Sequence, residues 1–253
     1  MNILISNDDG YFSAGIECLR DQLIAAGHHV FVVAPDRDYS ACGMSITLRQ
    51  PVTVRSVGVN EYAVSGTPVD CVGLALGGLI KEDIDLVVSG INNGANLSDD
   101  VFYSGTAAAA MEARRLRYPS LAISIPSVQP NHYDTAASVA IKLIERLHDV
   151  PYREELGFIN VNVPDVSLED LQGLKATALG ARQSPERHRE IVSEKGARHC
   201  WLGKVGAFVE PPEGSDVLYD HQCVEQGFAS VTPIKAQWLH EPFLKSCSEW
   251  LGS

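Results

Sequence analysis

The stretch ILISNDDG, residues 3–10, lies close to the N-terminus and is a short apolar run that gives way to four polar residues and a glycine. An apolar run of this length is typical of a strand buried on both faces of a parallel sheet. Apolar residues then recur at helical spacing up to Gly27, where the helix is expected to end. A second apolar run at residues 30–33 completes a β-α-β unit with a right-handed crossover.

The same alternation continues through the first two thirds of the chain. We expect short strands at 53–55 and 62–64, and a helix from the Thr67-Pro68 pair, a capping hydroxyl followed by proline, toward Leu79. The remaining expected elements are strands at 86–88, 121–125 and 158–161, an alanine-rich helix from near Thr106 and a long helix over 133–148. This pattern predicts an α/β fold with a mostly parallel sheet and helices on both of its faces.

The sequence changes character after Pro164. Gly, Pro and charged residues dominate from 180 to 215, short strand candidates lie at 175–177, 199–202 and 228–231, and an amphipathic helix is expected near 241–251. We therefore divide the chain into a core at 1–165, which carries the candidate binding residues described below, and a β-rich extension at 166–253. The extension is expected to serve oligomerisation by reaching across to a partner subunit.

The composition limits the possible functions. The net charge of −12 and the lack of a dense Lys/Arg block argue against binding a nucleic-acid polymer. No run of about 18 apolar residues appears, so we expect no membrane span. The N-terminus shows no signal-peptide pattern, and the six cysteines form no CxxC pair. These features predict a cytoplasmic protein whose thiols are reduced.

The paired carboxylates of Asp8 and Asp9 directly follow the first expected strand. Adjacent carboxylates repel each other unless a cation neutralises them, and Mg²⁺ or Mn²⁺ prefers such oxygen ligands. The alternative is a solvated turn, because Asp-Gly is a common turn pair. Ligands in open α/β sheets bind beyond the carboxyl ends of the strands, and this position favours the metal site.

Two further loops follow expected strands and carry polar side chains. The loop at 35–45 contains Ser40, and the loop at 89–97 contains Asn92, Asn93 and Asn96. Asn amides supply neutral metal ligands or hydrogen bonds to phosphate. Asn and Gly are also common in turns, so the residues alone leave open whether the loop at 89–97 binds a ligand or only forms a turn.

Ser104, Gly105 and Thr106 stand at the start of the alanine-rich helix. Small hydroxyl residues and a glycine at a helix N-terminus suit an anion, because the backbone amides point outward and the helix dipole favours negative charge. Simple helix capping would need only one of these hydroxyls. A phosphate site beside a metal site explains the whole group.

Several familiar catalytic motifs are absent from the sequence. It contains no GxGxxG in the first βα turn, no GxxxxGK[ST], no GxSxG and no HExxH. A nicotinamide or flavin enzyme, a P-loop NTPase, an α/β-hydrolase and a zincin are therefore disfavoured.

Together these segments resemble the SurE family, stationary-phase survival proteins that act as 5′/3′-nucleotidases. The matching motifs are SNDDG at 6–10, APDR at 34–37 with Ser40, GTPVDC at 66–71, VSGINNG at 88–94 with Asn96, YSGTA at 103–107 and NVNVP at 160–164. The resemblance implies a Rossmann-like core, a C-terminal arm exchanged between subunits, and a homodimer or homotetramer. Met44 departs from the polar residue usual in relatives, and residues 183–220 match poorly.

The resemblance also implies the roles of individual residues. The family's metal ligands fall on Asp8, Asp9, Ser40 and Asn92, and its phosphate site falls on Asn96, Ser104, Gly105 and Thr106. The resulting hypothesis is hydrolysis of nucleoside monophosphates, with Asp8 and Asp9 as the catalytic pair and one Mg²⁺ or Mn²⁺ per subunit activating water. The alternative is a nucleotide- or phosphate-sensing module that binds the same ligand without turnover.

Overall fold

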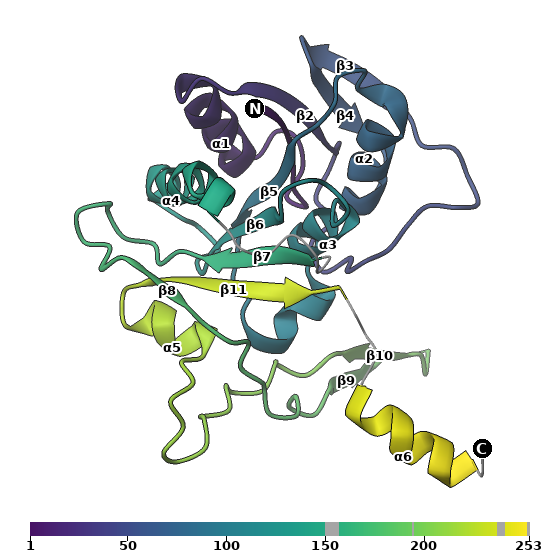
Figure 1. Cartoon of the computed structure of the whole chain (residues 1–253). Helices are drawn as coiled ribbons and strands as arrows, with labels where there is room; N and C mark the ends of the chain where they lie inside the picture. Colours follow the sequence, from purple (N-terminus) through teal and green to yellow (C-terminus); the bar gives the residue numbers. More distant parts are fainter. Residues whose placement is uncertain (150–156, 194, 237–240, 252–253) are drawn as a thin grey trace.

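The computed structural model describes residues 1–149, 157–193, 195–236 and 241–251. Its centre is a nine-stranded sheet in the order β3-β4-β2-β1-β5-β6-β7-β11-β8 (Figure 1). The strands from β4 to β7 run parallel to one another, whereas β3 and β11 are antiparallel to their inner neighbours. This mixed, mostly parallel sheet with helices confirms the predicted α/β, Rossmann-like fold class.

The elements of the first half match the predicted order. They are β1 Asn2–Ser6, α1 Ala14–Ala25, β2 His29–Pro35, β3 Val54–Gly58, β4 Glu61–Val64, α2 Pro68–Leu74, η1 Ala75–Leu79, β5 Leu86–Asn93, η2 Ser98–Tyr103, α3 Gly105–Glu112, β6 Ser120–Ile125, α4 Tyr133–Glu145, η3 Leu147–Asp149 and β7 Gly157–Asn162. The capping box at Thr67, with proline in the first turn of α2, forms as expected.

The strand side chains alternate between two hydrophobic layers. Ile3 and Ile5 belong to the core under α1 and α4, and Leu4 between them belongs to the core under α2 and α3. Figure 1 shows these helix pairs on the two sides of the sheet. All three side chains are fully buried, which explains why β1 is a continuous apolar run.

The order of the strands reverses direction around β1. The chain passes from β1 to β2 on one side, and β5 later pairs with β1 on the other side, with Ser6 opposite Ser89. Such a reversal opens a crevice beyond the carboxyl ends of the two strands. The segments after β1 and β5 therefore meet there.

The extension contributes to the same sheet. Its elements are β8 Leu174–Ala176, β9 Arg189–Val192, β10 Arg198–Trp201, α5 Asp220–Glu225, β11 Ala229–Lys235 and α6 Glu241–Leu251. β11 pairs with β7 and β8, while β9 and β10 form a separate hairpin. The strand candidates at 175–177, 199–202 and 228–231 and the final helix are confirmed. The division at residue 165 stays a prediction, and residues 194, 237–240 and 252–253 of the extension lie outside the described residues.

Two elements of the second half, β9 and α5, were missed by the sequence analysis, and several other elements, among them β5 and α4, differ in length from the expectation. β5 extends to Asn93, because Asn92 and Asn93 pair with Ser124 and Ile125 of β6 after a shift of register. The helix expected over 133–148 ends as an α-helix at Glu145 and continues as a 3-10 turn. In the described part of the chain, no helix has the length and apolar character needed to cross a membrane.

Candidate metal and phosphate site

Asp8 lies in the crevice at the end of β1 and is only 3% exposed. Its Oδ1 accepts a hydrogen bond of 2.5 Å from the hydroxyl of Thr106, at the N-terminus of α3. Burial raises the pKa of Asp8 to about 6; the Thr106 bond opposes this rise and the neighbouring Asp9 charge adds to it. The carboxylate therefore carries its charge at neutral pH at a cost in free energy.

Asp9 points to the segment at the end of β5. Its Oδ2 accepts a hydrogen bond of 2.9 Å from the backbone N–H of Asn93. Burial is the largest cause that raises the pKa of Asp9; the Asn93 bond opposes it, and the charge of Asp38 adds to the rise. The Asp9 carboxylate thus links the segment after β1 to the end of β5, whereas the Asp8 carboxylate is bonded to α3.

The loop at 35–45 lies over the same crevice. The backbone N–H of Tyr39 donates to the carbonyl of Asp8 at 2.8 Å, and that of Gly43 donates to the carbonyl of Tyr103 at 3.0 Å. Ser40 donates both its backbone N–H and its hydroxyl to Oδ1 of Asp38, at 2.7 and 2.6 Å. The Ser40 hydroxyl proton is therefore engaged, and the lone pairs of Oγ stay available for a cation.

Asn92 is buried at the end of β5, beside the residue that binds Asp9. Its Nδ2 donates to the carbonyl of Gly94 at 3.0 Å. This bond fixes the orientation of the amide and leaves the side-chain oxygen for a ligand. Three of the four predicted metal ligands thus lie at the ends of β1 and β5. The loop of the fourth, Ser40, is held at the same crevice by the hydrogen bond from Tyr39 to Asp8.

The N-terminal residues of α3 are arranged around Asp8. Ser104 caps the helix by accepting a hydrogen bond of 3.0 Å from the N–H of Ala107, and the Thr106 hydroxyl serves Asp8. A Cβ on Gly105 would lie 2.7 Å from Cβ of Asp8 and 3.0 Å from Sγ of Cys42. Glycine is therefore required at 105 for this close approach.

Asn96 has a structural setting distinct from the helix mouth. Its backbone N–H donates to Oδ1 of Asn162 at 2.9 Å, and its side-chain amide donates to Ser124 at 2.7 Å. Its carbonyl accepts from the side chains of both Asn160 and Asn162. This network ties the segment before η2 to β6 and β7. The phosphate-binding roles of Asn96, Ser104, Gly105 and Thr106 stay predictions.

The donor set fits a hard divalent cation. Neither Asp8 nor Asp9 forms an ion pair with a Lys, Arg or His among the residues that the structure describes. Two acidic groups with raised pKa values and no basic partner leave an uncompensated negative charge in a desolvated crevice. Carboxylate, hydroxyl and amide oxygens together are the ligands that Mg²⁺ and Mn²⁺ prefer.

Comparison with known proteins shows the family of the chain. The family model of the survival protein SurE matches residues 3–186. The chain belongs to the SurE family. It is 42% identical over 259 residues to the 5′-nucleotidase SurE of Haemophilus ducreyi, covering 99% of this chain and all of the relative. It is 46% identical over 246 residues to the 5′-nucleotidase SurE of Actinobacillus pleuropneumoniae, covering 93% and 94% of the two chains.

The fold of the whole chain is similar to that of a solved SurE structure. The crystal structure of the SurE protein from Aquifex aeolicus superposes with a TM-score of 0.85 at 34% identity, and each chain is covered completely. The likeness includes the extension, where the sequence motifs of the SurE family were weakest.

The sequence analysis assigned no individual role to Asp38 and Cys42 near the crevice, or to Asn160 and Asn162, which bind Asn96. The two asparagines share one face of β7 by strand alternation, and buried polar residues at that spacing are a signal that sequence reasoning could have used. Asp38 and Cys42 stand in a loop of ordinary turn residues, so no local pattern distinguishes them.

Met44, the departure noted from the sequence, lies outside the metal ligands. It lines an apolar cavity of about 640 Å³ together with Phe102 of η2 and Met111 of α3. The cavity thus borders the loop of Ser40 through Met44, and it reaches η2 and the last turn of α3.

Proposed function

We propose that this chain is a 5′-nucleotidase, a phosphoric monoester hydrolase that splits nucleoside 5′- and 3′-monophosphates into nucleoside and phosphate. The observation that carries the proposal is the pair of buried Asp8 and partly buried Asp9, uncompensated by any described basic side chain, beside the N-terminus of α3. The names of the relatives from H. ducreyi and A. pleuropneumoniae supply the substrate class.

The metal site we propose consists of Asp8, Asp9, Ser40 and Asn92 and holds one Mg²⁺ or Mn²⁺ per subunit. When bound, such an ion supplies Lewis-acid charge at the scissile phosphate. Asp38 supports this role by accepting a hydrogen bond from the Ser40 hydroxyl, which leaves the lone pairs of Oγ for a cation. The Gly94 carbonyl does the same for Asn92 by holding its Nδ2.

The phosphate is proposed to bind at Ser104, Gly105, Thr106 and Asn96. The first turn of α3 presents its amides and its positive dipole end to this side of the crevice, which favours an anion. Gly105 leaves room for the phosphate by having no side chain. Preorganised donors of this kind stabilise charge that develops on phosphoryl oxygens without reorganisation.

The nucleoside part of the substrate is proposed to lie toward the apolar cavity that Met44, Phe102 and Met111 line. The cavity volume, about 640 Å³, lies in the range typical of small-molecule sites. Met44 gives the cavity an apolar wall where the family resemblance implies a polar residue. Met44→Asn should therefore change the KM for nucleotides more than the KM for a small aryl phosphate.

The assembly is proposed to be a homodimer or homotetramer in the cytoplasm, with the 166–253 extension exchanged between subunits. Figure 1 shows α6 standing apart from the sheet, and its Phe243, Leu244, Trp250 and Leu251 are all more than half exposed. An apolar face of this kind on a single chain favours burial against another copy. Light scattering of the full chain and of a chain ending before α6 tests the proposal.

Phosphate release from a panel of nucleoside monophosphates tests the activity. The full-length protein is assayed after EDTA treatment and again with added Mg²⁺ or Mn²⁺. Metal-dependent release supports the proposal. Tight binding of nucleotide with no release at any metal concentration would instead establish the sensing module, the alternative drawn from the same loops.

A further inference from the structure

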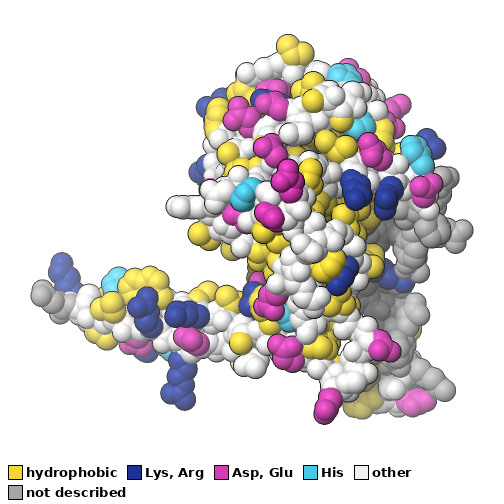
Figure 2. Space-filling model, turned by 90° about the vertical axis from the view of Figure 1, so that its left-hand side faces the viewer, with side chains coloured by type: hydrophobic (Ala, Val, Ile, Leu, Met, Phe, Trp, Pro, Cys, Tyr) yellow, Lys and Arg dark blue, Asp and Glu magenta, His cyan; other side chains and the backbone are white. Residues whose placement is uncertain are grey.

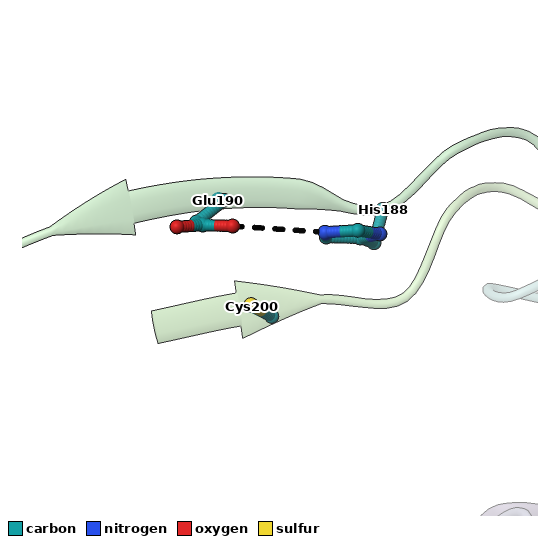
Figure 3. Close-up of side chains that lie close together, drawn as sticks. All are labelled: His188, Glu190 and Cys200. Atoms are coloured by element: carbon teal, nitrogen blue, oxygen red, sulfur yellow. Dashed lines mark ion pairs between the residues drawn. The ribbon is translucent and has the colours of Figure 1, made fainter. Parts of the chain in front are cut away.

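The β9–β10 hairpin gathers three metal-binding side chains far from the crevice. Glu190 lies directly opposite Cys200 in the antiparallel register, and His188 precedes Glu190 by two residues. Cross-strand pairing places Glu190 and Cys200 on one face of the hairpin, and Figure 3 shows His188, just before β9, beside Glu190. Figure 2 shows the hairpin as a narrow arm that projects from the rounded body, and all three residues are exposed.

The distances between the ligand atoms approach those of a bound ion. The imidazole nitrogen, the thiol sulfur and a carboxylate oxygen all lie within 4.8 Å of one another. Nε2 of His188 is 3.8 Å from Oε2 of Glu190. A tetrahedral zinc ion with bonds of about 2.0 to 2.3 Å separates its ligands by roughly 3.5 Å. Exposed side chains close the remaining distance of about 1 Å by small rotations.

We propose that His188, Glu190 and Cys200 bind one Zn²⁺ ion, with water in the fourth position. The imidazole and thiolate are softer ligands than the oxygens at Asp8 and Asp9, and this mixture favours zinc over Mg²⁺. Binding releases the thiol proton to solvent, because the thiolate is the ligand. The ion would join the two strands of the arm across their register.

Arg198 modulates this site. Its Nε and Nη2 donate to Oε1 and Oε2 of Glu190, each at 2.7 Å, and hold the carboxylate on the face that carries Cys200. A carboxylate oxygen retains a second lone pair, so Oε2 can bind an ion while Oε1 keeps its bond to Arg198. The guanidinium charge repels the ion, and Arg198→Gln is expected to tighten zinc binding several-fold.

Cobalt substitution of the metal-free, untagged full-length protein tests the site. Co²⁺ bound to a thiolate gives a sulfur-to-metal charge-transfer absorption in the near ultraviolet, which oxygen ligands at the crevice do not give. We expect one equivalent of this absorption in the wild type, its displacement by Zn²⁺, and its loss in Cys200→Ser. His188→Ala is expected to weaken Co²⁺ binding by about tenfold or more.

Two matched variants control for other sources of the signal. His199→Ala removes an imidazole on the opposite face of β10, and Cys42→Ser removes the thiol beside Asp8. Both should keep the absorption. Loss of the band in Cys42→Ser with retention in Cys200→Ser would overturn the proposal, as would a wild type with no thiolate band. Neither result depends on nucleotide hydrolysis.

Discussion

The Asp8–Asp9 crevice and the β9–β10 arm both gather metal-type ligands, but in opposite environments. Asp8 is 3% exposed and carries a raised pKa, whereas Glu190 is exposed and its pKa is lowered, chiefly by the hydrogen bond from Arg198. In the crevice the bare carboxylates are destabilised, and a cation relieves that cost. On the arm the side chains are already hydrated, so any affinity comes from the softness of the ligands. The folded crevice therefore carries an electrostatic cost that a bound cation would offset, whereas the arm carries no such cost.

Asp8→Asn is the change with the largest expected effect. It removes one metal ligand and one buried charge together, so metal-dependent phosphate release should fall about a thousandfold or more, since a catalytic ion supplies several kcal/mol. In EDTA, the free energy of unfolding in urea should rise by up to roughly 3 kcal/mol, because the burial cost of the charge disappears. Asp83→Asn, on an exposed carboxylate before β5, is the control and should change neither quantity. Wild-type turnover in Asp8→Asn would refute the role of the crevice.

Gly105→Ala should have the next largest effect. The added methyl group would lie 2.7 Å from Cβ of Asp8, so the carboxylate or the helix mouth must shift. Misplacement by about 1 Å costs on the order of a hundredfold in rate. The control is Gly73→Ala in α2, where no atom lies within 4 Å of the added Cβ. Steady-state kinetics of the two variants, with circular dichroism as a fold check, decide whether the close approach matters.

Asp38→Asn tests whether a side chain behind a proposed ligand tunes the metal. The side-chain amide of the variant accepts the hydrogen bond from the Ser40 hydroxyl less strongly than the carboxylate does, and one negative charge near Asp9 is lost. The metal concentration for half-maximal activity should rise about tenfold, with most of the maximal rate recovered at saturation. Asp36→Asn, which breaks only an exposed pair with Arg55, is the control. An equal shift in both variants would mean that general loop charge, and not the Ser40 contact, is responsible.

The pH dependence of metal binding is the smallest expected effect. The pKa of Asp8 is raised from 3.8 to about 6, so its folded form takes up a proton near pH 6. Below that pH the proton competes with the cation, and the half-saturating metal concentration should rise about fourfold between about pH 8 and about pH 5.5. The same shift means that the charge of Asp8 destabilises the metal-free fold above about pH 6, and that this cost fades as the pH falls toward 3.8. Calorimetric titration at several pH values measures the first effect, and an affinity independent of pH would contradict it.

The sequence predicted the first half of the fold well because local signals and tertiary contacts agree there. The fully buried β1 is a continuous apolar run, and Thr67-Pro68 starts its helix by capping that lies within three residues. β9 was missed because each of its residues is exposed and no apolar alternation marks it. The extension of β5 to Asn93 was missed because it depends on pairing with β6, which a polar sequence does not reveal.

The identities of the crevice residues Asp8, Asp9 and Asn92 were predictable because the carboxyl ends of neighbouring parallel strands must meet. Their partners were not, because those contacts join distant parts of the chain. Asp8 accepts a hydrogen bond from the hydroxyl of Thr106, a residue 98 positions away. Asp9 likewise accepts one from the backbone N–H of Asn93, 84 positions away.

The sequence by itself determined the alternation of strands and helices and the position of the acidic pair after the first strand, because these depend on residue type and short spacing. Only the tertiary structure decided that Thr106 serves Asp8, that Asp38 holds Ser40, and that the hairpin aligns His188 with Cys200. The physical reason is that a hydrogen bond or an ion site requires atoms within a few ångströms. Chain folding, and not sequence proximity, sets those distances.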